Sequence, residues 1–187
     1  MGKKVLIFKG SFRKKGYTQQ LIDEVIKGIN DEGGEAVLYE LSHKEIIPCR
    51  GCEYCYTHAG CSIKDYLTPM YKELEEGANF LMATPLYWAM MSGTTKVWLD
   101  RMHPILDGEH WGIRWPDVKY ATLYVSGNRD DDPLADEAVD LTERIIASIG
   151  LPSLGTMWVK YTDREDFVLS DEDKTKAYEM GRTLATN

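Results

Sequence analysis

The sequence predicts an α/β domain with a doubly wound, five-stranded parallel sheet in the order 2-1-3-4-5 and helices on both faces. Two features indicate this fold. Five short apolar runs alternate with helical stretches along the 187 residues, which favours parallel strands joined by right-handed crossovers. The first run is unbroken, as expected for a strand covered on both faces. A chain of this length can bury one core, so we expect a single domain over residues 1–187.

The first strand, residues 5–8, ends at Gly10, and an amphipathic helix follows it. The apolar side chains of this helix share one face, and they are Leu21, Ile22, Val25, Ile26 and Ile29. Gly33 and Gly34 end the helix. Residues 35–41 form the second strand, whose charged ends suit the edge of a sheet.

The middle of the chain predicts a helix, a strand and a second helix. Thr68 and Pro69 have the form of an N-cap followed by proline at the first helical position. The third strand covers residues 78–84 and is expected to stop at Pro85. Ser92 can cap the next helix, which is expected to run through Met102.

The last part of the chain predicts two more strands and two more helices. A long connection at residues 104–118 comes first, and connections of this length usually have a function. The fourth strand, residues 120–126, precedes a helix over residues 132–150. The fifth strand covers residues 155–161, and a capping box at residues 170–173 begins the terminal helix.

Composition and charge exclude several kinds of partner. The net charge is −8 and the basic residues are scattered, which argues against nucleic acid and anionic membranes. The chain has no apolar run of transmembrane length and no signal-peptide core, so we expect a cytoplasmic protein. In the cytoplasm the four cysteines are expected as reduced thiols or metal ligands.

The loop after the first strand has the composition of an anion site. Ser11, Arg13, Thr18 and Gln19 bring hydroxyls and positive charge to the start of a helix, where backbone N–H groups are free. The loop matches neither G-x-x-x-x-G-K-[ST] nor G-x-G-x-x-G, so a single phosphate suits it better than a nucleoside triphosphate or a dinucleotide. The alternative is an ordinary loop whose Lys and Arg side chains are solvated.

An aromatic turn follows the third strand. In a sheet of order 2-1-3-4-5, ligands bind between strands 1 and 3, beyond the carboxyl ends of the strands. Tyr87 and Trp88 would therefore face a planar ring while the first loop holds a phosphate, and FMN has this shape. The alternative is that the two side chains belong to the core or to an interface.

The four cysteines lie close together in the sequence. Cys49, Cys52, Cys55 and Cys61 form a C-x2-C-x2-C-x5-C pattern, and three thiols at intervals of three are typical of compact [4Fe–4S] motifs. Zinc is the second interpretation, because paired zinc hooks are usually separated by a longer loop. The third interpretation is that the cysteines hold no metal. His58, inside this loop, is expected at the surface.

Three segments carry a family resemblance. GSFRKKGYTQQL at residues 10–21 resembles the phosphate loop of the NADPH-dependent FMN reductases and iron–sulfur flavoproteins. TPLYWAMMSGTTKVWLDR at residues 84–101 is similar to their second motif, and IPCRGCEYCYTHAGCSIKD at residues 47–65 to their cysteine segment. In this order and spacing the three motifs together are specific. The resemblance thins after residue 101 and implies a flavodoxin-like fold.

The resemblance also implies which residues contact FMN. Those of the first loop are Ser11, Phe12, Arg13, Tyr17, Thr18 and Gln19; those of the second are Pro85, Leu86, Tyr87 and Trp88; a third, weaker match is Ser126, Gly127 and Asn128. Two positions depart from the family pattern, since Phe12 replaces the usual proline and Tyr17 the usual asparagine. Both changes could lower the affinity for FMN.

The resemblance implies an FMN-dependent oxidoreductase. FMN would take electrons from NADPH or NADH, or from a ferredoxin, and pass them to a small-molecule or protein acceptor. A [4Fe–4S] cluster on the cysteines would relay single electrons. The cofactor carries the chemistry, so no catalytic residue is assigned. The alternatives are a flavodoxin-type carrier without its own substrate and a cysteine-based metal or redox sensor.

The connection at residues 104–118 bears on these alternatives and on assembly. His110, Trp111, Arg114 and Trp115 look suited to covering a flavin edge, which a simple carrier leaves exposed. Exposed tryptophans here, together with the family resemblance, also indicate a homodimer or homotetramer.

Overall fold

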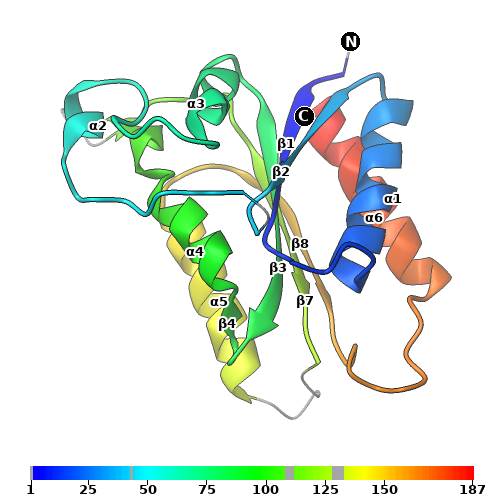
Figure 1. Cartoon of the computed structure of the whole chain (residues 1–187). Helices are drawn as coiled ribbons and strands as arrows, with labels where there is room; N and C mark the ends of the chain where they lie inside the picture. Colours follow the sequence, from blue (N-terminus) through cyan, green and yellow to red (C-terminus); the bar gives the residue numbers. More distant parts are fainter. Residues whose placement is uncertain (1, 43, 108–111, 128–132) are drawn as a thin grey trace.

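The computed structural model describes residues 2–42, 44–107, 112–127 and 133–187, and it has three layers (Figure 1). The central sheet has the order β2-β1-β3-β7-β8, and every neighbouring pair on this path is parallel. Its strands are β1 (Lys4–Lys9), β2 (Glu35–Glu40), β3 (Asn79–Tyr87), β7 (Tyr120–Val125) and β8 (Ser153–Val159). Numbered among themselves, these strands have the order 2-1-3-4-5, so the predicted fold class is confirmed.

Helices cover both faces of the sheet. One face carries α1 (Tyr17–Asp31) and α6 (Asp171–Thr186), and the other carries α3 (Thr68–Glu75), α4 (Gly93–Asp100) and α5 (Pro133–Ser148) (Figure 1). The smaller elements are α2 (Tyr54–Thr57), β4 (Met90–Met91), η1 (His103–Ile105), β5 (Leu106–Asp107) and β6 (Gly112–Ile113). Among the described residues, no helix is long and apolar enough to span a bilayer.

Two apolar clusters lie on the two faces of the sheet. The alternation of β1 divides its side chains between them, with Val5 and Ile7 facing α1 and α6. Leu6 and Phe8 face the other way, where the ring of Phe8 packs 4.4 Å from that of Trp98 on α4. Both faces of β1 are therefore dry, which explains its unbroken apolar run.

The structure corrects the predicted end of the third strand. β3 does not stop at Pro85, because it continues to Tyr87 and pairs Pro85 with Val125 of β7. Beyond this point the strand turns back as an antiparallel hairpin in which Leu86 pairs with Met91 of β4. Pro85 lies where the parallel ladder ends, so its missing N–H costs little hydrogen bonding.

The predicted helix caps have mixed outcomes. Ser92 caps α4 and accepts from the N–H of Thr95, and Ser170 forms a capping box with Asp173 at the start of α6. Both predictions are confirmed. The predicted N-cap of α3, Thr68, is wrong. Leu67 holds that position, and the Thr68 hydroxyl accepts from the Asp65 N–H at 2.8 Å. Here the side chain serves the preceding turn instead of the helix.

Helices α1 and α6 cross at two glycines. A Cβ atom at Gly28 would lie 2.0 Å from the carbonyl oxygen of Tyr178, and one at Gly181 would lie 2.0 Å from that of Val25. Real Cβ atoms essentially never come so near a backbone oxygen. The two helix backbones can therefore touch only because neither crossing residue has a side chain.

We predict that Gly181→Ala destabilises the fold by about 1–3 kcal/mol, because the added methyl group forces the helices apart. The midpoint of urea unfolding measures this change. Gly93→Ala is the matched control, since a Cβ at this first residue of α4 meets nothing within 4 Å. An unfolding midpoint for Gly181→Ala equal to that of Gly93→Ala would contradict the glycine crossing.

Candidate functional site

A pocket of about 520 Å³ opens at the carboxyl ends of the strands. We call it the strand-end pocket. Its lining residues come from the last residues of β3 and β7, the start of α1, and the loops after β1, β7 and β8: Ser11, Arg13, Gly16, Tyr17, Thr18, Pro85, Leu86, Tyr87, Val125, Ser126, Gly127, Thr162 and Asp163. It lies where α/β sheets of this winding bind their ligands.

The first wall of the strand-end pocket is the N-terminus of α1. Gly16 is the N-cap residue and offers no side-chain acceptor to the first-turn N–H groups. Thr18 and Ser11 are almost fully buried beside it, and the Ser11 hydroxyl accepts from the N–H of Arg13 at 3.3 Å. Backbone donors, hydroxyls and one guanidinium thus surround a space that suits a small anion.

Several predicted site residues lie elsewhere. The amide of Gln19 bonds to Lys9 and Asp23, at 2.5 Å and 2.8 Å, and Gln19 does not line the strand-end pocket. Phe12 is exposed, and Trp88 is 99% exposed; neither lines this pocket. Asn128 lies outside the described residues.

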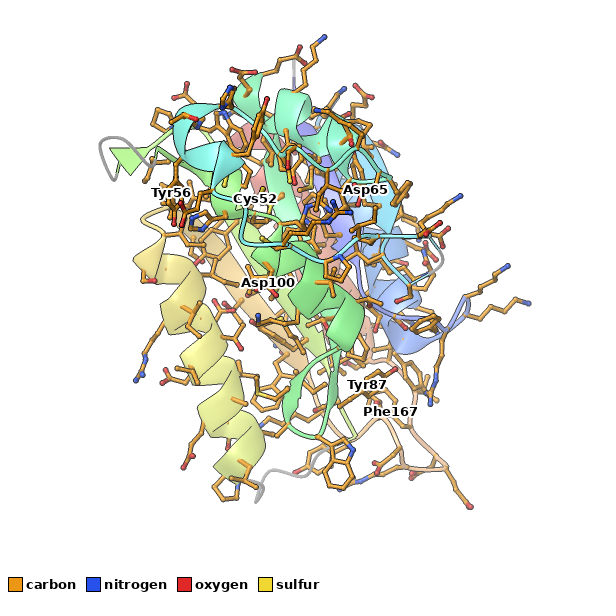
Figure 2. All side chains as sticks on the ribbon, turned by 60° about the vertical axis from the view of Figure 1, so that its left-hand side comes forward. Cys52, Tyr56, Asp65, Tyr87, Asp100 and Phe167 are labelled. Atoms are coloured by element: carbon orange, nitrogen blue, oxygen red, sulfur yellow. The ribbon has the colours of Figure 1, made fainter. Side chains whose placement is uncertain are left out.

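Tyr17, which departs from the family pattern, has a structural partner. Its hydroxyl donates to the carbonyl of Phe167 at 2.8 Å, and the two rings meet edge to face at 4.8 Å. Tyr17 therefore fastens the loop after β8 to the start of α1; its partner Phe167 is labelled in the lower part of Figure 2, below Tyr87.

The second wall is the hairpin of β3 and β4. Its two-residue turn is Trp88-Ala89, and both residues have positive φ, of 51° and 58°. Such turns favour Asn and Gly because other side chains are strained there. The strained turn leaves Tyr87 half-exposed at the rim of the strand-end pocket, with Leu86 buried behind it.

A buried hydroxyl cluster joins the two walls. The Ser92 hydroxyl donates to the carbonyl of Gly10 at 2.9 Å, and Thr84 accepts from both the Ser92 N–H and the Thr95 hydroxyl. A Cβ at Gly10 would lie 1.9 Å from the Thr95 Oγ1 atom. The loop after β1 thus rests directly on the N-cap of α4.

The third wall includes two residues that the sequence analysis missed. Thr162 donates to the carbonyl of Ser126 through its N–H and its hydroxyl, at 3.1 Å and 3.0 Å. A Cβ at Gly127 would lie 2.9 Å from the carboxyl carbon of Asp163. The sequence offered one signal for these two residues. It predicts a parallel fifth strand, and the carboxyl end of that strand must lie at the same edge of the sheet.

A second pocket, of about 450 Å³, contains all four cysteines. We call it the cysteine pocket. Its wall consists of residues 49–56 and 61–63 together with Asp100, Arg101, His103 and Pro104. Cys49 and Cys52 are exposed, and Cys55 and Cys61 are partly buried. No three acidic, His or Cys side chains within the described ranges have the arrangement of a metal site.

The thiols of the cysteine pocket differ in environment. The Ser62 hydroxyl lies 3.2 Å from the Cys52 sulfur and lowers the pKa of that thiol. Burial raises the pKa of the Cys55 thiol. Cys52 is therefore the thiol more readily ionised, and thiolates are the form that binds metals.

A buried ion pair anchors the loop of the cysteine pocket. Arg101 donates to Asp65 at 2.7 Å, and both side chains are almost fully buried. Burial by itself raises the pKa of Asp65, but hydrogen bonds from Arg101 and from the Ile47 N–H outweigh it, so this pKa is lowered. The pair carries its charges without exposure to water, and its bidentate geometry is the kind that can hold a loop in place.

The structure corrects the expected role of the connection at residues 104–118. Trp115 is only 4% exposed and packs in the core, while Arg114 donates to the carbonyls of Pro104, Cys55 and Leu106. Neither residue lies at the strand-end pocket, so neither covers a flavin edge there. His110 and Trp111 lie outside the described residues.

The two pockets lie at opposite ends of α4. Ser92, before the helix, belongs to the hydroxyl cluster, and Arg101, after it, lines the cysteine pocket. A helix of 8 residues is about 12 Å long. Figure 2 shows the same separation, with Cys52 near the top, Asp100 between and Tyr87 near the bottom.

Comparison with protein families gives one match over most of the chain. The family described as NADPH-dependent FMN reductase matches residues 3–128. This range contains both pockets except for the loop after β8.

Curated relatives carry the name iron-sulfur flavoprotein. One from Methanocaldococcus jannaschii is 32% identical over 105 residues, which are 56% of this chain and 54% of that protein. One from Archaeoglobus fulgidus is 29% identical over 182 residues, or 94% of this chain and 76% of that protein. The chain spans about half the length of the M. jannaschii relative and of a second A. fulgidus relative at 32% identity, with 54% and 51% covered.

Solved structures share the fold at low identity. The NAD(P)H:quinone oxidoreductase from Methanothermobacter marburgensis superposes with a TM-score of 0.74 at 18% identity, covering 98% of this chain and 96% of that one. The azoreductase AzrA gives a TM-score of 0.65 at 14% identity, with 98% and 99% covered. A flavodoxin from the domain Archaea gives 0.57 at 13%, with 98% and 96% covered. The fold is flavodoxin-like.

Proposed function

The chain belongs to the NADPH-dependent FMN reductase family, and from this premise we propose that it is an oxidoreductase that binds FMN in the strand-end pocket. Electrons enter from NADPH or NADH and leave to a small-molecule or protein acceptor. The observation that carries the proposal is the joining of an anion-binding helix terminus and an aromatic hairpin in one pocket.

The residues of the strand-end pocket fit the two ends of FMN. The first-turn N–H groups of α1, with Ser11 and Thr18, would hold the phosphate, and Arg13 would balance its charge. At the other end Tyr87 offers a half-exposed ring for stacking, and buried Leu86 keeps water from the face behind it. When bound, FMN supplies the hydride chemistry, and the protein orients it.

Ser126 and Gly127 would shape the flavin edge of the strand-end pocket. The polar atoms of Ser126 already bond within the protein, since its hydroxyl accepts from the Trp158 indole at 2.9 Å and its N–H donates to Val159. Ser126 therefore acts by fixing the loop. Gly127 lets Asp163 come near, which narrows this end of the strand-end pocket.

A flavodoxin-type carrier is the alternative function. The argument that the connection at residues 104–118 covers the flavin no longer distinguishes the reductase from the carrier, because Arg114 bonds to the carbonyl of Cys55 and Trp115 lies in the core. Family membership favours the reductase. Turnover of a nicotinamide cofactor decides between them, because a carrier has no substrate of its own.

We predict that protein saturated with FMN oxidises NADPH or NADH with a quinone as acceptor, and that heating releases FMN. Thr18→Val should weaken FMN binding by about 1–3 kcal/mol, because a phosphate oxygen loses its hydroxyl partner. Fluorescence titration of FMN measures the affinity. Thr175→Val, at an exposed hydroxyl of α6, is the control.

Release of FAD instead of FMN would contradict the assignment of the strand-end pocket. An unchanged FMN affinity in Thr18→Val would show that the phosphate binds elsewhere. Bound FMN without any nicotinamide oxidation would favour the carrier.

We further propose that the cysteine pocket holds a [4Fe–4S] cluster. Its four thiols line one cavity, and the C-x2-C-x2-C spacing supplies the donor set that such clusters use. The relatives named iron-sulfur flavoprotein support the same group. Cys49, Cys52, Cys55 and Cys61 would be the ligands, and the cluster would pass single electrons. The competing function of this pocket is a metal or redox sensor.

We predict that anaerobically purified protein contains iron and sulfide, with a broad brown absorbance beside the flavin bands. Cys52→Ser should lose all three signals and keep bound FMN, because the strand-end pocket lies at the other end of α4. Ser62→Ala is the control, since it removes the hydroxyl beside Cys52 and no ligand. Wild-type protein with full flavin and no iron would contradict the cluster, and zinc in its place would favour the sensor.

We also propose a homo-oligomer, a homodimer or homotetramer, and we assign its interface to α5. Of the two tryptophans expected at this surface, Trp115 is buried and Trp111 lies outside the described residues. Instead, Leu134, Leu141 and Ile145 form an exposed apolar stripe at helical spacing. If two copies of α5 pair antiparallel about Leu141, Arg144 of one lies beside Glu137 of the other. In this arrangement the apolar stripe of one copy would cover that of the other, as a two-fold interface requires.

We predict that light scattering at micromolar concentration shows a dimer or tetramer and that Leu141→Glu dissociates it. In the dimer this substitution would place two new carboxylates beside the two of Glu137, near the two-fold axis. Val168→Glu, at another exposed apolar residue, is the control and should keep the oligomer. A monomeric wild type would remove the proposal. An oligomer that survives Leu141→Glu would place the interface elsewhere.

A further inference from the structure

Arg101 holds both ends of the cysteine loop. Its Nη1 atom donates to the carbonyl of Ile47 at 2.6 Å, before the first cysteine, and its Nη2 atom to the carbonyl of Ile63 at 3.5 Å, after the last. The same two nitrogens form the fork to Asp65, at 2.7 Å and 3.2 Å. Four of the five guanidinium N–H donors therefore have a hydrogen-bond acceptor in the protein.

The fifth guanidinium donor, the Nε–H group, has no such acceptor. The Nε atom of Arg101 is buried and has no hydrogen-bond partner among the described residues. The whole side chain is 1% exposed, so this N–H is shielded from bulk solvent. A buried donor on a charged group is costly to leave unpaired, and native structures rarely do so without a ligand or ion nearby.

The surroundings of Arg101 indicate an anionic sulfur partner. Arg101 lines the cysteine pocket together with the four thiols. Four thiolates around an iron–sulfur core give a net negative group, since the thiolates contribute more charge than the core offsets. Hydrogen bonds to the sulfurs and nearby charge set the reduction potential of such clusters.

We propose that Arg101 is the positioning residue of the cluster site, and that its Nε–H donates a hydrogen bond to a sulfur of the cluster or of a ligating cysteine. The inference rests on the proposed cluster. In this arrangement one guanidinium fixes the loop before metal arrives and then favours the reduced, more negative cluster. Asp65 limits that effect, because its carboxylate offsets part of the positive charge of the guanidinium.

Two substitutions separate this role from a purely structural one. Arg101→Lys keeps the charge and removes both the fork and the Nε–H, so the midpoint potential of the cluster should become more negative and iron loading should fall severalfold. Asp65→Asn keeps the shape and removes the counter-charge, so the potential should become more positive. Arg144→Lys, an exposed arginine of α5, is the control and should keep the wild-type potential.

The measurement is a spectroscopic redox titration of anaerobically reconstituted full-length protein, with iron, sulfide and FMN determined on each sample. Opposite shifts in the two variants support the proposal. Wild-type potentials in both variants, or shifts in the same direction, overturn it. If Arg101→Lys does not fold, Asp65→Asn decides alone.

Failure of the cluster itself gives a different result. Wild-type protein that binds FMN and yet takes up no iron or sulfide overturns the cluster and this inference together, and leaves the flavin function standing. Loss of FMN from wild type, with iron present, counts only against the proposed flavin site.

Discussion

The buried hydroxyl cluster at the start of α4 is the constraint on which both pockets depend. Thr84, Ser92 and Thr95 bond to one another, and Ser92 also holds the carbonyl of Gly10. Glycine is required at residue 10 because a Cβ there would collide with the Thr95 hydroxyl. The loop that suits a phosphate and the hairpin that carries Tyr87 therefore cannot move independently. From this fixed start, α4 leads to Arg101 and the cysteine loop.

The sequence was sufficient to predict the strand order, the amphipathic α1 and the caps at Ser92 and Ser170, because these depend on local pattern and on general rules of winding. It was insufficient at Pro85 and Thr68. Proline usually ends a strand, but β3 passes through Pro85 into a hairpin. Thr68 has the right residue type for a cap, but its hydroxyl bonds to the preceding turn. Tertiary partners decided both positions.

The candidate site was predicted in part for the same reason. The loops after the first and third strands carry recognisable residues, and the structure brings Ser11, Thr18 and Tyr87 to one pocket. Gln19 has the right position in the motif, but its amide bonds to Lys9 and Asp23 and it does not line the pocket. Conversely, Thr162 has no motif and joins the pocket only through the sheet. The spacing of residues in a motif specifies neither the direction of a side chain, as at Gln19, nor the strands that the sheet brings together, as at Thr162.

The exposed Trp88 also gives the chain an optical property. Of the four tryptophans that the structure describes, Trp98 and Trp115 are buried and Trp158 is partly covered, whereas the Trp88 indole is almost wholly in water. It is held at the tip of a two-residue turn, next to the rim of the strand-end pocket. Among the tryptophans that the structure describes, an aqueous quencher such as acrylamide reaches this indole first. Of these four, Trp88 therefore contributes most to the red edge of the emission, where it reports whatever approaches the hairpin.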